Sequence, residues 1–142
     1  MTLTYKSETG YTYVEEGSGP VVILLHGLMG GPENFQPVLA DLRDSYRVVA
    51  PMLPLFDLPL RKTCVQELSQ FLHGFITHKR FHRVALVGNS LGGHVALRYA
   101  LTCPGKVTGM VLTGSSGLRE NTMGTTLPQA RASGQEIGRA HV

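Results

Sequence analysis

A single serine lies among glycines where an apolar, strand-like run of residues gives way to a helical pattern. Gly88, Ser90 and Gly92 form a G-x-S-x-G pattern within G-N-S-L-G-G, directly after the apolar run 84–87. A helical pattern follows, so the sequence predicts a sharp strand-to-helix turn with Ser90 at its tip. Glycines two positions to either side would remove the Cβ atoms that so tight a bend cannot accommodate. Such a turn presents a hydroxyl that can act as a nucleophile.

A serine hydroxyl needs a base to take its proton and donors to hold the oxyanion that its attack creates. The NH of Leu91 falls at the expected helix N-terminus, where unpaired donors and the helix dipole favour negative charge. The loop H-G-L-M-G-G, residues 26–31, leaves another predicted strand and can bring the NH of Leu28 to the same point. Two converging donors would form an oxyanion hole, in which each donor typically contributes about 3 kcal/mol of transition-state stabilisation.

Several apolar runs predict the strands that must position these groups. Residues 21–25 have no polar alternation, as expected of a central strand covered on both faces. Further strands are predicted at residues 3–5, 11–14, 46–51, 84–87 and 107–113. The first two suggest an antiparallel hairpin, and the later strand-helix-strand order requires a parallel sheet with right-handed crossovers. We therefore predict an α/β, doubly wound fold: a mostly parallel sheet with an antiparallel N-terminal hairpin.

Three stretches carry apolar residues at helical spacing. These residues are Phe35, Val38, Leu39 and Leu42 in the first, Val65, Leu68, Phe71, Leu72, Phe75 and Ile76 in the second, and Leu91, Val95, Leu97, Tyr99 and Ala100 in the third. The proline-rich segment 52–60 is expected to be a loop, after which Thr63 and Gln66 offer a capping box. Pro104 is expected to stop the third helix.

On the H-G-L-M-G-G loop and the G-N-S-L-G-G-H elbow, the chain resembles the first half of an α/β-hydrolase fold protein, over about residues 3–120. The resemblance implies that Ser90 is the nucleophile and that the backbone NH groups of Leu28 and Leu91 are the oxyanion donors. The residues that it assigns to supporting the loop and the elbow are His26, Gly27, Gly88, Asn89, Gly92 and Gly93. It also implies that His26 is not the base, because the triad of this family runs serine, acid, histidine, with the last two on later loops.

The residues after Ser90 do not offer that acid and base convincingly. The chain has no aspartate beyond Asp57, and the acids and histidines that follow Ser90 are Glu120, Glu136, His94 and His141. We interpret His94, one helical turn after Ser90, as a residue that packs or caps near the elbow, and Glu120 as a solvated loop residue.

The end of the chain suggests why the acid and base are missing. Residues 136–142 resemble the in-frame translation of a common sequencing-library adapter. We expect residues 1–127 to be the N-terminal part of a single α/β-hydrolase domain and residues 128–142 to be a disordered or artefactual tail. We then expect this chain to be catalytically inactive, and residues 107–113 to form an unpaired edge strand that lowers solubility.

A serine nucleophile at position 90 favours acyl transfer among the reactions of this fold. A serine excludes relatives that need an aspartate there, such as the haloalkane dehalogenases and epoxide hydrolases of this fold. The leading hypothesis is hydrolysis of a carboxylic ester or thioester through an acyl-enzyme on Ser90. An alternative is hydrolysis of a carbon-carbon bond in ring-cleavage products, because the elbow with Asn89 and the G-S-S-G-L segment 114–118 resemble those enzymes. Asn89 could instead only hydrogen-bond within the elbow.

Two further alternatives stay open. A non-catalytic binding fragment is a reading of another class, since this fold also hosts inactive relatives. Met29, Phe35 and the loop 52–60 either line an acyl pocket or belong to the core.

Composition bounds the remaining possibilities. With 142 residues, 42% of them hydrophobic, the chain is expected to form one globular domain. It has neither an apolar run long enough to span a bilayer nor a signal sequence, so we expect a cytoplasmic protein with no membrane partner. The net charge of +3 is spread out, and we interpret its densest stretch, residues 78–83, as a solvated helix end rather than a nucleic-acid site. We expect Cys64 and Cys103 to be free thiols, a small acyl compound to be the substrate, and no metal or cofactor to be needed.

Overall fold

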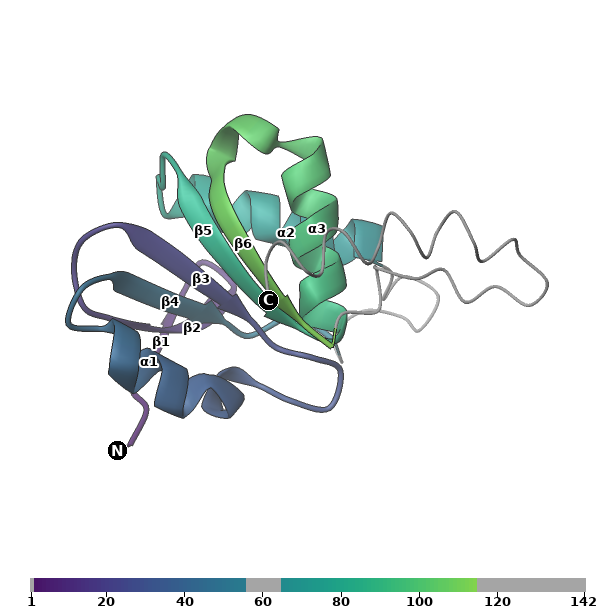
Figure 1. Cartoon of the computed structure of the whole chain (residues 1–142). Helices are drawn as coiled ribbons and strands as arrows, with labels where there is room; N and C mark the ends of the chain where they lie inside the picture. The colour runs from purple at the N-terminus through teal and green to yellow at the C-terminus, as the bar shows by residue number, and fades with distance from the viewer. Residues whose placement is uncertain (1, 56–64, 115–142) are drawn as a thin grey trace.

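Six strands form one mixed sheet in the computed structural model, which describes residues 2–55 and 65–114 (Figure 1). In chain order the elements are β1 (Tyr5–Glu8), β2 (Tyr11–Glu16), β3 (Val21–Leu25), the 3-10 helix η1 (Pro32–Phe35), α1 (Gln36–Leu42), β4 (Arg47–Pro51), α2 (Val65–His78), β5 (Val84–Asn89), α3 (Leu91–Thr102), the 3-10 helix η3 (Pro104–Lys106) and β6 (Val107–Thr113). The strands lie side by side in the order β1-β2-β4-β3-β5-β6. The predicted α/β class is confirmed.

The hairpin at the start of the sheet is antiparallel, as predicted, but its first strand is Tyr5–Glu8 rather than residues 3–5. β1 pairs with β2, and the two residues between them, Thr9 and Gly10, have φ angles of 51° and 83°. Two consecutive positive φ values are what a type I′ turn requires, and this turn matches the twist of the strands. β2 continues the sheet by pairing antiparallel with β4.

The four later strands are parallel, and β3 has the central position that its apolar run predicts. It pairs with β4 on one side and β5 on the other, and β6 follows β5 at the edge of the described sheet. The register places Leu25 opposite Gly88 and Asn89 opposite Thr113. The carboxyl ends of β3, β5 and β6 therefore meet at one edge, where open α/β sheets bind their ligands.

Helices cover both faces of the sheet, with α1 on one face and α2 and α3 on the other (Figure 1). Alternate residues of β3 show this directly: Val22 and Leu24 belong to the core beneath α1, whereas Ile23 and Leu25 belong to the core beneath α2 and α3. The uninterrupted apolar pattern of β3 follows from burial on both sides.

The helices follow the predicted apolar faces with local differences. The side chains of α2 that the structure buries include Leu68, Leu72, Phe75 and Ile76. The first predicted helix is split, because Phe35 ends η1 and α1 begins at Gln36, and Val38 remains 36% exposed. α3 ends at Thr102, before Pro104 as expected. The expected capping residue Thr63 and the expected tail, residues 128–142, lie outside the described residues.

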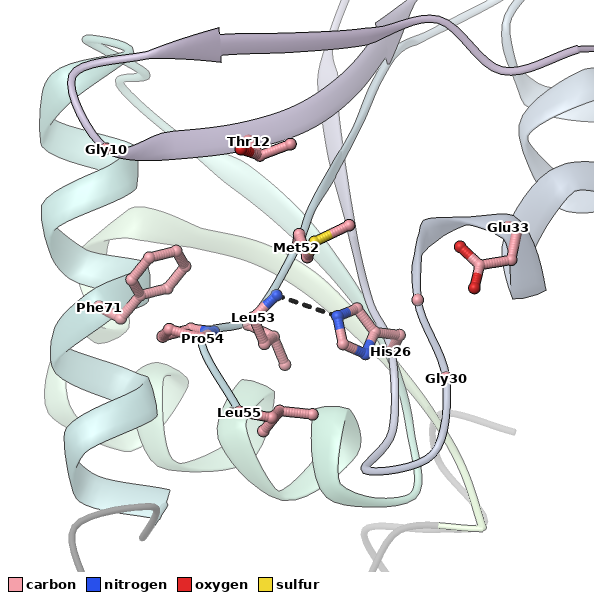
Figure 2. A pocket seen from close by; sticks show the side chains of 11 residues that line it. Gly10, Thr12, His26, Gly30, Glu33, Met52, Leu53, Pro54, Leu55 and Phe71 are labelled. Carbon is pink, nitrogen blue, oxygen red and sulfur yellow. Dashed lines mark hydrogen bonds between the residues drawn. The ribbon is translucent and has the colours of Figure 1, made fainter. Parts of the chain in front are cut away.

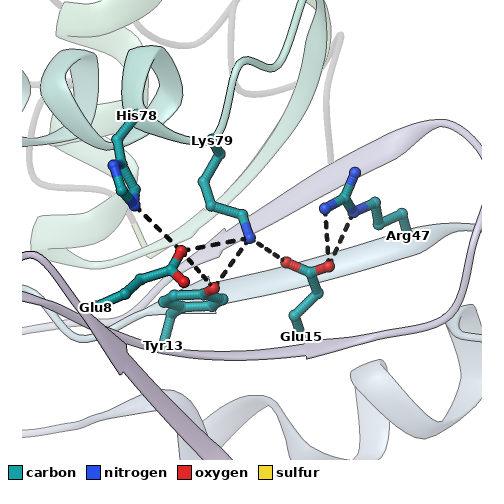
Figure 3. Close-up of polar contacts among 6 residues, drawn as sticks. All are labelled: Glu8, Tyr13, Glu15, Arg47, His78 and Lys79. Atoms are coloured by element: carbon teal, nitrogen blue, oxygen red, sulfur yellow. Dashed lines mark hydrogen bonds and ion pairs between the residues drawn. The ribbon is translucent and has the colours of Figure 1, made fainter.

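The interpretation of residues 78–83 as a solvated helix end is wrong for Lys79 (Figure 3). The Lys79 side chain is only 11% exposed, and its Nζ lies 2.8 Å from Glu15 Oε1 and 3.0 Å from the Tyr13 hydroxyl. His78 Nε2 lies 3.1 Å from Glu8 Oε1. The end of α2 therefore contacts the β1-β2 hairpin. The local charge pattern could not reveal these partners, because Tyr13 precedes Lys79 by 66 residues.

Within the described ranges, the structure has no helix with the length and apolar character needed to cross a membrane. Cys103 is a free thiol, as expected, and Cys64 lies outside the described residues.

Candidate active site

Ser90 lies on the turn between β5 and α3, with backbone angles of φ 55° and ψ −119°. A non-glycine residue in this sparsely populated region carries strain of order 1–3 kcal/mol. Ser90 is the N-cap residue of α3, yet its side chain makes no capping hydrogen bond, and the residue is exposed. The hydroxyl is thus presented to the outside on a strained turn, in the geometry that the G-x-S-x-G pattern predicts.

The glycines around Ser90 allow α3 to pack directly on the strand ends. A Cβ at Gly88 would lie 2.5 Å from the Gly92 carbonyl oxygen and 2.5 Å from the Gly93 Cα. A Cβ at Gly92 would overlap the carbonyl oxygen of Leu25 at the end of β3. These contacts involve backbone atoms that cannot rotate away, so close approach rather than backbone freedom explains glycine at both positions.

The loop after β3 lies against the serine. A Cβ at Gly27 would be 3.2 Å from Ser90 Cβ and 3.7 Å from Ser90 Oγ. A turn closed by the Gly30 NH and the Gly27 carbonyl, 3.2 Å apart, follows directly, and Leu28 within it is 52% exposed. The structure therefore brings together residues 27 and 90, which are far apart in the sequence.

The two predicted oxyanion donors both lie at this junction. Leu91 is the first residue of α3, a position whose NH has no acceptor within the helix. The Gly93 and His94 NH groups both donate to the Ser90 carbonyl, over 3.0 and 3.2 Å, and so belong to the first turn. Leu28 follows Gly27 in the loop, and its NH donates to no backbone carbonyl of the described residues.

Both ring nitrogens of His26 form hydrogen bonds, and the one with Leu53 joins the loop after β3 to the loop after β4 (Figure 2). Its Nε2 accepts a hydrogen bond of 2.9 Å from the Leu53 NH, so in the neutral ring Nδ1 carries the proton and donates to the Gly27 carbonyl over 2.8 Å. The residue is 2% exposed, and burial lowers the pKa of the imidazole despite the Gly27 bond. Because both nitrogens are occupied, His26 supports the loop and offers no lone pair to the Ser90 proton.

Asn89 and Ser90 are both tied to the end of β6. The Ser90 NH donates to the Thr113 carbonyl over 2.9 Å, and the Thr113 hydroxyl donates to Asn89 Oδ1 over 3.1 Å. The alternative that Asn89 bonds only within the elbow is wrong, because Thr113 on the neighbouring strand β6 donates to its side chain. Thr113 was missed as a site residue; the one signal for it was its place at the end of a predicted parallel strand.

A pocket of about 310 Å³ opens beside the loop after β3 (Figure 2). The residues that line it are Gly10, Thr12, His26, Gly30, Gly31, Glu33, Met52, Leu53, Pro54, Leu55 and Phe71. Met29, Phe35 and the loop 52–60 were candidates for lining a pocket. Residues 52–55 of that loop do line this pocket. Phe35 does not, because it is buried in the core beneath α1, and Met29 is 94% exposed. Residues 56–60 of that loop lie outside the described residues.

Of the candidate acid and base residues, the structure describes only His94. His94 is half-buried on α3, and its backbone NH bonds to Ser90 as described above. Glu120, Glu136 and His141 lie outside the described residues. The described structure thus contains Ser90, its turn and the loop 26–31 that carries Leu28.

A strained serine between the parallel strand β5 and the helix α3, next to a glycine-containing loop, is typical of the nucleophile elbow of α/β proteins. The chain belongs to the alpha/beta hydrolase fold family, because residues 20–136 match the sequence profile of that family. The predicted family is confirmed.

Solved and curated relatives agree with this assignment. The crystal structure of an alpha/beta hydrolase enzyme from the metagenome of lagoon sediments of Mar Chica, Morocco, is 36% identical with a TM-score of 0.77, over 97% of this chain and 67% of that one. A 2-hydroxy-6-oxo-6-(2'-aminophenyl)hexa-2,4-dienoic acid hydrolase of Metapseudomonas resinovorans is 35% identical over 75% of this chain. Haloalkane dehalogenase 2 of Mycobacterium bovis is 30% identical over 70% of this chain. The chain spans 39% and 36% of the length of these two curated relatives.

Proposed function

We propose that the protein to which this chain belongs is a serine hydrolase that cleaves a carboxylic ester or thioester through an acyl-enzyme on Ser90. The observation that carries the proposal is the strained, uncapped Ser90 with the Gly27 loop packed against its side chain. Strain of this kind persists where the surrounding structure over-determines it, and it recurs at nucleophiles. The serine also argues against the aspartate chemistry expected of dehalogenases.

In this mechanism the hydroxyl of Ser90 attacks the carbonyl carbon, and the carbonyl oxygen becomes an oxyanion. The NH groups of Leu28 and Leu91 donate to that oxygen, aided by the positive end of the α3 dipole. Collapse of the tetrahedral intermediate expels the alcohol or thiol, and water then releases the acid. The proposed base and its acid partner belong to later loops of the whole protein, as the serine, acid, histidine order of the family implies.

The direct test uses a full-length gene that contains this sequence. The purified enzyme is expected to hydrolyse para-nitrophenyl acetate or butyrate, with turnover reduced on the order of 10⁶-fold by Ser90→Ala. Ser45→Ala is the matched control, because Ser45 is exposed just before β4, at the opposite end of the parallel strands. Turnover that survives Ser90→Ala would contradict the proposal.

The 142-residue chain itself is proposed to be inactive. Without the base the hydroxyl stays protonated, and the expected rate with an activated ester is that of buffer. Turnover by the purified chain that Ser90→Ala abolishes would show that the base lies within these residues.

Carbon-carbon bond hydrolysis is the second candidate, and the 35% identity to a dienoic acid hydrolase supports it. Such a reaction would use the same elbow and donors. A ring-cleavage dienoate assayed beside the para-nitrophenyl esters separates the two candidates: a preference of more than about tenfold in kcat/KM for either substrate, or about 1.4 kcal/mol, assigns the activity.

A further inference from the structure

A second small pocket lies between α2 and α3, apart from the site around Ser90. Its volume is about 200 Å³, and its lining residues are Ser69, Gln70, His73, Tyr99, Thr102 and Cys103. This volume is below the roughly 300–1,000 Å³ of pockets that hold drug-sized ligands, so only a small group would fit.

The pocket contains a thiol beside an imidazole. Cys103 is free and half-buried, and its Sγ lies 3.9 Å from His73 Nδ1. The thiolate rather than the thiol is the nucleophile, and a neighbouring imidazole can take the thiol proton. The pair is therefore suited to react with a soft electrophile.

A buried hydroxyl lies in the same pocket, beside the Cys103 thiol. Tyr99 is 1% exposed, and its phenolic oxygen has no well-placed hydrogen-bond partner among the described residues. Leaving such a group unpaired typically costs about 1–3 kcal/mol. Burial, and secondarily the Cys103 thiol, raises the pKa of Tyr99 to about 12, so at neutral pH the phenol keeps its proton and can donate it to a ligand.

We propose that Cys103 is a covalent modification site for small α,β-unsaturated carbonyl compounds, with the adduct seated between α2 and α3. The Cys103 Sγ forms a bond to the β carbon while the carbon-carbon π bond breaks. The thiol proton passes to His73 and then to the α carbon, so the product is a saturated thioether and neither an oxidant nor a reductant is consumed. The carbonyl oxygen of the adduct accepts the hydrogen bond of the Tyr99 hydroxyl.

The test measures alkylation of Cys103 by intact-protein mass spectrometry, in a Cys64→Ser background that leaves one thiol. With methyl vinyl ketone at neutral pH, Cys103 is expected to react about tenfold faster than glutathione, and His73→Gln is expected to remove that advantage. His82→Gln is the matched control, because His82 is exposed and does not line the pocket. Reaction no faster than glutathione, or an unchanged rate in His73→Gln, would overturn the proposal.

A second reagent isolates the role of the phenol. Tyr99→Phe removes only the hydroxyl, and it is expected to slow methyl vinyl ketone several-fold while leaving methyl methanethiosulfonate, which has no carbonyl, unchanged. Equal effects on the two reagents would mean that Tyr99 contributes only to packing and would overturn its assigned role. Thermal unfolding of each variant shows that the rates belong to folded protein, and adduct formation is expected to raise the wild-type Tm because it satisfies a buried donor.

Discussion

The Ser90 NH and the Thr113 carbonyl oxygen are joined by a hydrogen bond of 2.9 Å between the elbow and the end of β6. The Thr113 side chain adds a second bond, to Asn89, so the neighbouring strand holds both residues of the turn. On the other side, the Gly92 backbone packs on the Leu25 carbonyl. These contacts explain how a residue with φ 55° is kept in a conformation that it would leave in isolation.

The strain at Ser90 can be measured by comparing two variants. Glycine tolerates a positive φ and alanine does not, so Ser90→Gly is expected to be more stable than Ser90→Ala by roughly 1 kcal/mol, after the larger unfolded-state entropy of glycine is counted. Urea denaturation of both variants gives the difference. An alanine variant as stable as the glycine variant would mean that the turn is not strained.

Close packing at the elbow predicts that adding one methyl group at Gly92 will strongly lower the stability of the fold. Gly92→Ala would push a Cβ into the Leu25 carbonyl oxygen and is expected to lower the free energy of unfolding by about 1–3 kcal/mol or more. Gly109→Ala on β6 is the matched control, because a Cβ there meets nothing within 4 Å, and its effect is expected to stay within about 0.5 kcal/mol. Equal losses in the two variants would remove the packing argument.

The buried His26 predicts a pH dependence of stability. Its pKa is lowered in the folded state from the ordinary value of 6.5, so below that pH the unfolded chain binds a proton that the folded chain does not. The free energy of unfolding is therefore expected to fall as the pH decreases from 7 to 5. His26→Asn is expected to flatten this slope and to cost about 2 kcal/mol at pH 7, since the Leu53 NH loses its acceptor. His82→Asn, at an exposed position, is the matched control for the loss at pH 7, with an expected change within about 0.5 kcal/mol.

The ion pair between Lys79 and Glu15 predicts a loss of stability when either charge is removed. Lys79→Met leaves the 13% exposed Glu15 side chain with Arg47, 2.9 Å away, as its remaining ion-pair partner, and is expected to cost about 2 kcal/mol. Lys6→Met on the exposed β1 strand is the control, with an expected change within about 0.5 kcal/mol. Thermal or urea unfolding measures both.

The same pair defines a pH window. Burial opposes both charges, but Lys79 and Arg47 together lower the pKa of Glu15, and the Glu15 and Tyr13 contacts raise the pKa of Lys79. The Glu15 contribution is present above its ordinary value of 4.5 and is lost as the pH falls below it, whereas the Lys79 contribution is present below 10.5 and is lost as the pH rises beyond it. A wild-type stability advantage over Lys79→Met that persists unchanged at pH 3 would contradict this account.

The sequence by itself determined the succession of strands and helices along the chain and the turn that carries Ser90, because periodicity and glycine spacing are local properties. The apolar run 21–25 is typical of a strand covered on both faces, and the G-N-S-L-G-G stretch predicts a turn from its own residues. The loop 26–31 was also identifiable as a source of donors, because its H-G-L-M-G-G pattern directly follows a predicted strand.

Tertiary structure alone decided which distant groups meet. The bond from Leu53 to His26, the bond from Ser90 to Thr113 and the pairing of Lys79 with Glu15 each join segments at least 23 residues apart. Such contacts depend on strand order and register, which burial of whole faces determines and which no short pattern encodes. The sequence therefore identified the nucleophile, whereas the folded sheet decided what holds it in place.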